Sequence, residues 1–267
     1  MKQRLIELLS NMKKYNRGIM SKEIYGLEPE VCYDALVVAP GWKPTKIITD
    51  PSYGVSVLSE HSYISGYLVE KDGLKIAWIQ TASGANNLLD HLLVCAELSF
   101  RKMIFVGAVG SLVPEYEVGD FCTPEYSISG SAALSYLEER ISENTMFQRI
   151  CPDRAYVDSV VKLAKEKGYE LRRAPVFCTD SISLEYSHLD EIKATGAKLI
   201  EMETAAFYKL AEMFEVPSVA LFVVSDNSAS GKPLLGRGET LDRKYSFSRS
   251  TVIPEMICAI SRQEFGE

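Results

Sequence analysis

The stretch LIEMETAAFYKLAEMFEVPSVALFVVSDN, residues 199–227, contains the patterns that decide the fold. Strand-length apolar runs occur at 197–202 and 218–225, and the segment 202–214 between them places apolar residues at helical spacing. A strand, a helix and a second strand in this order predict part of an α/β sheet.

The same alternation continues through most of the chain. No Pro-, Gly- or Ser-rich linker and no internal repeat interrupts it, so we expect one sheet rather than several small domains. The further strand candidates are 35–39, 66–70, 75–80, 103–108 and 174–178, and the further helical patterns are 86–100, 155–168 and roughly the first 15 residues.

The composition favours a small-molecule partner. Of the 267 residues, 46% are hydrophobic, which is enough for a sizeable core. Lys and Arg total 29 against 36 Asp and Glu, and the net charge of -7 argues against general affinity for nucleic acid or anionic membranes. No apolar run reaches the ~18 residues of a spanning helix and no signal-peptide pattern is present, so we expect a cytoplasmic protein.

Several functional classes lack their motifs. The chain has no G-x-x-x-x-G-K-[ST], H-E-x-x-H or G-x-S-x-G, and its only G-x-G, at 236–238, follows no strand candidate. The six cysteines form no C-x-x-C pair and are interpreted as reduced core residues. Because His61, His91 and His188 lack ligand spacing, we predict no metal and no bound cofactor.

Three carboxylates stand at predicted strand ends, where ionised groups are costly if they are buried without partners. Glu201 and Glu203 follow one strand candidate, and Asp226 ends the next. Ligands in open α/β sheets bind outside the carboxyl ends of the strands, so Glu203 and Asp226 are predicted to project into one cleft. The alternatives are a neighbouring cation or a helix cap for Glu201 and a cap or turn role for Asp226.

A glycine-rich segment supplies a second feature of this predicted cleft. The residues FVGAVGSLVPEYEVGD, 105–120, are expected to join a strand through a turn to a second short strand after Gly119 and Asp120. Such a turn exposes backbone N–H groups that can hold an anion or a ribose. A plain tight strand exit is the alternative.

These motifs together resemble the nucleoside phosphorylase/nucleosidase superfamily, most closely purine nucleoside phosphorylases of the bacterial hexameric type. The resemblance rests on VGAVGSLVPEYEVGD, IEMETAA and VVSDN, which occur in the family's order and spacing. It extends from about residue 34 to the segment DRKYSFSRSTVIPEMICAI, which stands in place of the family's last helix. It implies a three-layer αβα sandwich around a mixed central sheet over 34–267, preceded by an N-terminal helical extension, 1–33.

The resemblance also implies roles in cleaving a purine–ribose bond. Glu203 would bind the ribose 2′- and 3′-hydroxyls and stabilise the oxocarbenium-like transition state, with Met202 against the sugar and Glu201 facing the same cleft. Asp226 would protonate N7 of the leaving base, assisted by Arg243. A core position for Met202 and a solvated helix face for Arg243 are the alternatives.

The base and sugar pocket shows both agreement and departure. The loop CTDSISLEY, 178–186, lacks the Gln/Arg pair with which uridine phosphorylases bind pyrimidines, so a purine is favoured. Ile182 stands where the purine enzymes usually stack an aromatic residue on the base. In TASGANN, Thr81 and Ser83 are neutral donors beside Gly84.

The phosphate site departs furthest from the family. Thr45, Phe105 and Ala108 stand where the family has an arginine, an arginine and a serine, and the neighbour's arginine is also missing near His61. A lysine replaces a bidentate arginine only as a point charge. The remaining candidates for phosphate binding are Gly41, Lys43, Lys46, Ala108 and Gly110.

Three functions therefore stay open at this point. The expected one is a phosphorylase that uses inorganic phosphate as co-substrate; the alternatives are a nucleosidase that uses water and a non-catalytic nucleoside-binding relative. Because the family completes each site with residues of a neighbouring subunit, we expect a homo-oligomer, either a dimer or a hexamer.

Overall fold

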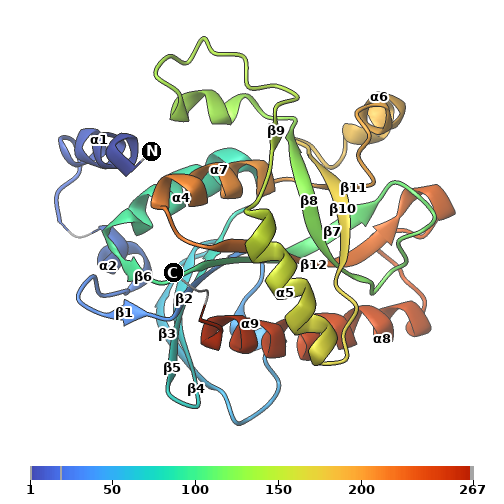
Figure 1. The fold of residues 1–267 in the computed structure, drawn as a ribbon, viewed down its shortest axis with the longest axis horizontal. Helices are drawn as coiled ribbons and strands as arrows, with labels where there is room; N and C mark the ends of the chain where they lie inside the picture. The colour runs from blue at the N-terminus through green and yellow to red at the C-terminus, as the bar shows by residue number, and fades with distance from the viewer. Residues whose placement is uncertain (1, 19, 265–267) are drawn as a thin grey trace.

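The computed structural model describes residues 2–18 and 20–264, and a mixed sheet lies at the centre of this part of the chain (Figure 1). Its strands are β2 (Ala35–Pro40), β3 (Gly54–Glu60), β4 (Ser65–Lys71), β5 (Leu74–Thr81), β7 (Met103–Ser111), β8 (Phe121–Ser129), β9 (Arg149–Ile150), β10 (Arg172–Cys178), β11 (Leu199–Glu201) and β12 (Ser218–Asn227). The strand order is β11-β10-β8-β12-β7-β2-β5-β4-β3, with β9 paired to β8. A separate parallel pair joins β1 (Cys32–Tyr33) to β6 (Ser99–Phe100).

Helices cover both faces of the sheet. They are α1 (Lys2–Lys13), α2 (Met20–Tyr25), α3 (Pro44–Ile47), α4 (Ala85–Val94), α5 (Arg154–Glu166), α6 (Leu189–Ala194), α7 (Thr204–Phe214), α8 (Glu239–Phe247) and α9 (Ile253–Arg262). In Figure 1, α1, α4 and α7 lie on one side of the sheet, and α5, α8 and α9 lie on the other. This arrangement confirms the predicted α/β fold with three layers.

The period-2 alternation of side chains along β12 explains why both faces are covered. Ala220, Phe222 and Val224 belong to the core under α4 and α7, whereas the intervening residues 219, 221 and 223 belong to the core under α5 and α9. Successive strand residues point to opposite faces, so an uninterrupted apolar run requires a packed layer on each side.

Most of the sequence-predicted elements are present, but two boundaries were wrong. The helix predicted over 86–100 ends at Val94, and a short 3-10 turn leads from it into β6. The strand predicted over 103–108 continues to Ser111 because β11 and β12 both pair with its end. The glycines predicted to form an open turn are therefore part of the sheet as far as Ser111.

The N-terminal segment packs onto this fold. Leu5, Tyr25 and Leu27 belong to the same apolar core as α4 and α7. The division into an extension, 1–33, and a main domain, 34–267, stays a prediction. Within the described residues, no helix is both long and apolar enough to cross a membrane.

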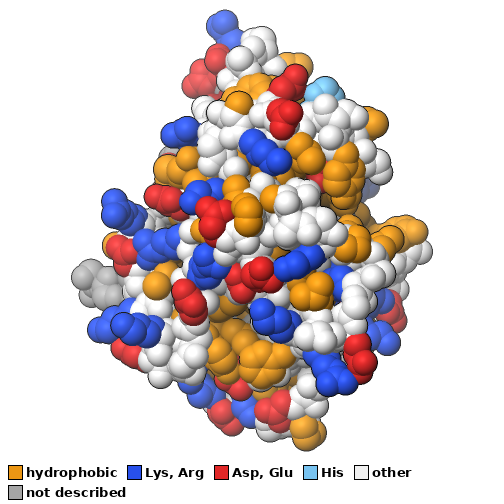
Figure 2. Space-filling model, turned by 90° about the vertical axis from the view of Figure 1, so that its right-hand side faces the viewer, with side chains coloured by type: hydrophobic (Ala, Val, Ile, Leu, Met, Phe, Trp, Pro, Cys, Tyr) orange, Lys and Arg blue, Asp and Glu red, His pale blue; other side chains and the backbone are white. Residues whose placement is uncertain are grey.

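The face at the right of Figure 1 is mixed in character. Figure 2 shows Lys and Arg side chains interspersed with Asp and Glu side chains over this face, and hydrophobic side chains gather in patches between them. The visible charges thus alternate in sign rather than forming one broad basic area.

Candidate active site

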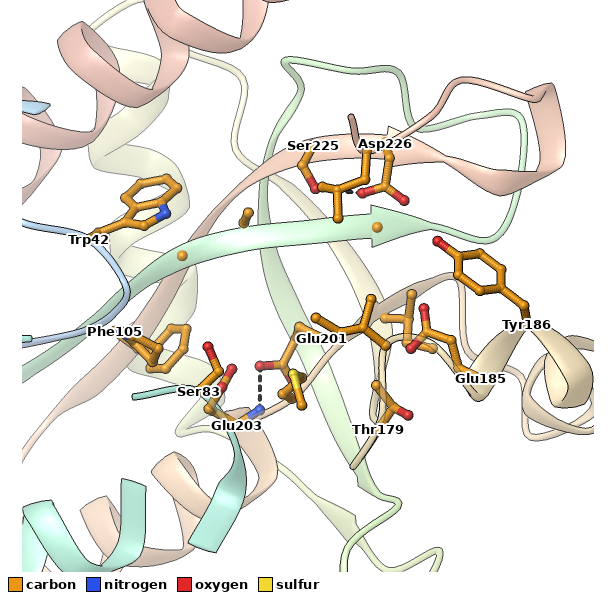
Figure 3. Close-up of a pocket in the computed structure, with 18 residues that line it drawn as sticks. Trp42, Ser83, Phe105, Thr179, Glu185, Tyr186, Glu201, Glu203, Ser225 and Asp226 are labelled. Atoms are coloured by element: carbon orange, nitrogen blue, oxygen red, sulfur yellow. Dashed lines mark hydrogen bonds between the residues drawn. The ribbon is translucent and has the colours of Figure 1, made fainter. Parts of the chain in front are cut away.

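A cavity of about 200 Å³ lies where the carboxyl ends of β2, β7, β11 and β12 converge. Figure 3 shows two ends to this cavity: Trp42, Ser83, Phe105 and Glu203 lie at one end, and Thr179, Glu185, Tyr186, Ser225 and Asp226 lie at the other. Gly107, Ala108, Gly110, Ile182, Glu201 and Met202 also line it. Glu203 and Asp226, which were predicted to face one cleft, thus line the same cavity.

The turn from β11 into α7 is fixed by the side chain of Glu201. Its Oε2 accepts hydrogen bonds from the backbone N–H of Glu203 at 2.7 Å and of Thr204 at 3.0 Å. Its Oε1 accepts from the Thr204 hydroxyl at 2.8 Å and from the Cys178 thiol at 2.7 Å. Glu201 thus caps the first N–H groups of α7, which is the alternative considered from the sequence, and its oxygens are already bonded within the protein.

Glu203, two residues later, faces the start of another helix. Its Oε1 accepts a 2.5 Å hydrogen bond from the backbone N–H of Gly84, the residue that precedes α4. Gly84 has φ of 104°, a conformation that side-chain-bearing residues rarely adopt. Burial, reinforced by the charge of Glu201, raises the pKa of Glu203 to about 8. The buried carboxyl is thereby held between two helix N-termini at one end of the cavity.

A bulge in β12 directs Asp226 into the cavity. The register between β12 and β7 shifts between Val224 and Asp226, so Asp226 lies opposite Gly110. A Cβ at position 110 would lie 3.0 Å from Asp226 Oδ2, so a glycine there leaves room for the carboxyl group. Gly110, predicted from the sequence as a phosphate contact, thus lines the cavity opposite Asp226.

Asp226 has both a raised pKa and a nearby cation. Burial raises the pKa of this carboxyl, while the 2.6 Å hydrogen bond from the Ser225 hydroxyl and the charge of Arg237 lower it in part. Arg237 Nη1 donates to the Ser225 carbonyl at 2.8 Å and to the Leu234 carbonyl at 3.1 Å, and its guanidinium lies 4.3 Å from the ring centroid of Tyr245. Arg237 therefore links the end of β12, next to Asp226, to Leu234 in the loop that follows this strand.

The structure does not bring Arg243 to the cavity. Its side chain is 77% exposed and pairs with Glu239 one turn earlier in α8, which is the solvated helix face considered as its alternative. Arg237 lies in the Gly-Arg-Gly segment that had been examined only as a dinucleotide motif. Its position before α8, where a loop returns towards β12, is a tertiary feature that the sequence pattern does not contain.

The predicted phosphate contacts are only partly gathered. Lys43 pairs with Glu60 at 2.6 Å, and Lys46 and Gly41 are exposed; none of the three lines the cavity. Ala108 does line it, beside Phe105 and Trp42. Among the described lining residues none is Lys, Arg or His, whereas four are carboxylic acids. Where an anion site was expected, the described residues thus place no cationic side chain at the cavity.

Of the other predicted contacts, Gly84 lines only a neighbouring hollow and the rest line the cavity, whereas three further residues were missed. Ser83 and Met202 line both this cavity and an adjoining hollow, and Ile182 is at the edge, 46% exposed. The residues missed are Glu185, Tyr186 and Trp42. Glu185 and Tyr186 belong to the loop that the sequence had assigned to base binding, so the loop was found but not its polar side chains.

Comparison with known proteins identifies the family. The family model described as Phosphorylase superfamily matches residues 49–245, and the chain belongs to this superfamily. DeoD-type purine nucleoside phosphorylase from Streptococcus pneumoniae serotype 19F (strain G54) is 26% identical over 188 residues, which cover 68% of this chain and 76% of the relative. The same type of enzyme from Bacillus subtilis (strain 168) is 24% identical over 132 residues, 49% of this chain and 54% of the relative.

Solved structures share the fold. Purine nucleoside phosphorylase from Toxoplasma gondii, in complex with immucillin-H, aligns with a TM-score of 0.72 at 15% identity, over 89% of this chain and 95% of the other. The 5′-methylthioadenosine/S-adenosyl homocysteine nucleosidase of Campylobacter jejuni aligns with a TM-score of 0.67 at 16% identity, over 85% and 97%. The resemblance to the nucleoside phosphorylase/nucleosidase superfamily is confirmed.

The raised pKa of Glu203 predicts a specific dependence of stability on pH. The folded protein holds this proton more tightly than the unfolded chain does, so ionisation costs stability as the pH rises from about 4.5 through about 8. Glu203→Gln removes the ionisable group and so does not lose this stability. The unfolding temperature of Glu203→Gln, relative to that of the unsubstituted protein, should therefore increase as the pH rises from 5 to 9. Thermal unfolding across this range measures the difference.

The control for this measurement is Glu212→Gln, because Glu212 is an exposed glutamate on the same helix. Its unfolding temperature should follow that of the unsubstituted protein at every pH. A constant offset between Glu203→Gln and the unsubstituted protein from pH 5 to pH 9 would show that Glu203 does not ionise with a raised pKa.

Proposed function

We propose that this protein cleaves the N-glycosidic bond of purine nucleosides. The observation that carries the proposal is the placement of two carboxyls of raised pKa, the buried Glu203 and the half-buried Asp226, at opposite ends of one cavity. Membership of the phosphorylase superfamily supports an enzyme of glycosyl transfer or hydrolysis. The purine preference rests on the DeoD-type relatives and on the missing Gln/Arg pair in 178–186.

The two carboxyls supply complementary steps. Glu203 accepts hydrogen bonds from the ribose hydroxyls and, once ionised, stabilises the positive charge that develops on the sugar. Asp226, whose pKa is raised by its burial, donates its proton to N7 of the purine as the bond from C1′ to N9 breaks. The base departs as a neutral molecule, and the bond electrons go with it.

The acceptor that this chain favours is water. Phosphate carries negative charge, and the described lining offers it four carboxylic acids, three aromatic side chains and no cationic side chain. Water carries no charge and meets no such penalty beside Trp42 and Phe105. The sequence favoured phosphate, and the identity to DeoD-type phosphorylases keeps phosphorolysis as the second candidate.

The proposal also includes the oligomeric state and the cellular location of the enzyme. Ser83 and Met202 are shared between the cavity and the adjoining hollow, which is bounded by Ala132, Tyr136 and Asp180. A second copy of the chain in a homo-oligomer would cover such a hollow, and a cytoplasmic location fits a nucleoside-cleaving enzyme. Both were expected from the sequence.

The activity is tested by incubating the protein with inosine, adenosine and their 2′-deoxy analogues, with and without inorganic phosphate, and measuring free base. We expect base release at equal rates in both buffers, with ribose, or 2-deoxyribose from the deoxy analogues, as the second product. Asp226→Asn should lower the rate about 10²–10⁴-fold, the usual contribution of a general acid. A strict requirement for phosphate would establish phosphorolysis, and no base release from any nucleoside would reject the proposed activity.

Arg237 and Arg243 provide a matched pair for locating the cation that influences Asp226. Arg237→Met removes a charge that lowers the pKa of Asp226, so its acid form should persist to higher pH. The alkaline limb of the pH–rate profile should move upward by up to about one unit, the usual size of protein pKa perturbations. Arg243→Met should leave the profile in place, and a shift in that variant alone would restore the assignment made from the sequence.

A further inference from the structure

A third carboxyl, Glu185, lies at the end of the cavity that holds Asp226, where the purine base is proposed to bind. It has no part in the cleavage steps described above. It begins the short 3-10 helix Glu185–His188 after β10 and lines the cavity together with Asp226. In Figure 3 its carboxyl group and the hydroxyl of Tyr186 face the side of the cavity that holds Asp226. Glu185 and Asp226 are near enough for their charges to interact.

One oxygen of Glu185 is buried without a partner. The residue is only 9% exposed, and its Oε2 has no hydrogen-bond partner among the described residues. Thr179 forms the side-chain hydrogen bond of this carboxyl. An unpaired buried oxygen is costly, and a ligand group that pairs with it recovers that cost. This oxygen therefore lacks a hydrogen-bond partner that a polar group of a bound ligand can supply.

The chemistry of a purine indicates which group this is. N7 and the substituent on C6 lie side by side on one edge of the base, so two neighbouring side chains can contact both at once. If Asp226 donates to N7, a carboxyl next to Asp226 lies at the C6 substituent. We propose that Glu185 Oε2 binds the C6 substituent of the purine and thereby determines which base is accepted. This inference rests on the proposed function.

A carboxyl at this place can recognise either common purine type. Ionised, it accepts a hydrogen bond from the 6-amino group of adenine; protonated, it donates one to the 6-oxo group of hypoxanthine. Burial and the charge of Asp226 raise the pKa of Glu185 to about 7, and the bond from Thr179 opposes this in part. Both forms are thus populated near neutrality.

The other ionisable groups at this site are accounted for. Asp226 and Tyr186 face Glu185 directly, Arg237 acts on Asp226, and Tyr245 lies beneath Arg237. Glu201 and Glu203 line the same cavity from β11 and its turn into α7. Because Asp226 and Glu203 act on every nucleoside, the ratio of two substrates cancels their titration to first order and isolates that of Glu185.

The test is the ratio of kcat/KM for adenosine to that for inosine between pH 6 and pH 8. In the unsubstituted protein it should rise about tenfold or more, because the wrong protonation form leaves a buried polar pair unsatisfied. In Glu185→Gln the amide offers a donor and an acceptor at every pH, so the ratio should be flat. Glu191→Gln, an 81% exposed neighbour in α6, should behave as the unsubstituted protein does.

Binding of free adenine and hypoxanthine, followed by calorimetry at pH 6 and pH 8, separates this inference from the proposed activity. In one outcome no nucleoside is cleaved, but the binding preference between adenine and hypoxanthine reverses or narrows with pH only when Glu185 is present. This outcome supports base recognition by Glu185 and rejects the activity. If nucleosides are cleaved at a ratio independent of pH, the inference is overturned and the activity stands. If neither base binds and no nucleoside is cleaved, both are overturned. Should Glu185→Gln fail to fold, the pH dependence of the unsubstituted protein still decides.

Discussion

The hydrogen bonds that Glu201 accepts from the backbone N–H groups of Glu203 and Thr204 are the constraint on which the site depends. They fix the turn between β11 and α7, and they use a buried carboxylate in place of water to satisfy the first donors of a helix. Because the turn is fixed, the next carboxyl along the chain, that of Glu203, reaches the backbone N–H of Gly84 just before α4. Two helices and a strand thereby hold one reactive group.

This arrangement gives the cavity an unusual charge balance. Glu185, Glu201, Glu203 and Asp226 all line it, and no cationic side chain of the described residues does. Burial raises the pKa of each of the four carboxyl groups, so the cavity carries less negative charge than four free carboxylates would. A neutral nucleoside, whose sugar becomes positively charged in the transition state, suits such a cavity better than an anion does.

Local patterns were sufficient to predict the sheet, its covering helices and the positions of Glu203 and Asp226, because apolar periodicity and strand ends are properties of short segments. The site itself depends on contacts between distant segments, and there the sequence was insufficient. Arg237 approaches Asp226 only through the loop between β12 and α8, while Arg243, the second residue of the predicted last-helix segment, turns to solvent. Lys43 and Lys46 follow β2, the strand expected to lead into the phosphate site. In the structure Lys43 pairs with Glu60 and Lys46 is exposed. The length of β7 was also missed, because its last residues are strand only when β11 and β12 lie alongside.

The central claim, that Glu203 and Asp226 act on opposite parts of one purine nucleoside, is tested most directly by a crystal structure with a non-cleavable purine nucleoside analogue. The account predicts ribose hydroxyls within hydrogen-bonding distance of the Glu203 carboxyl group and N7 of the base facing Asp226, with the sugar on the side of Trp42 and Phe105. An analogue bound in the reverse orientation, or bound away from both carboxyls, would contradict it.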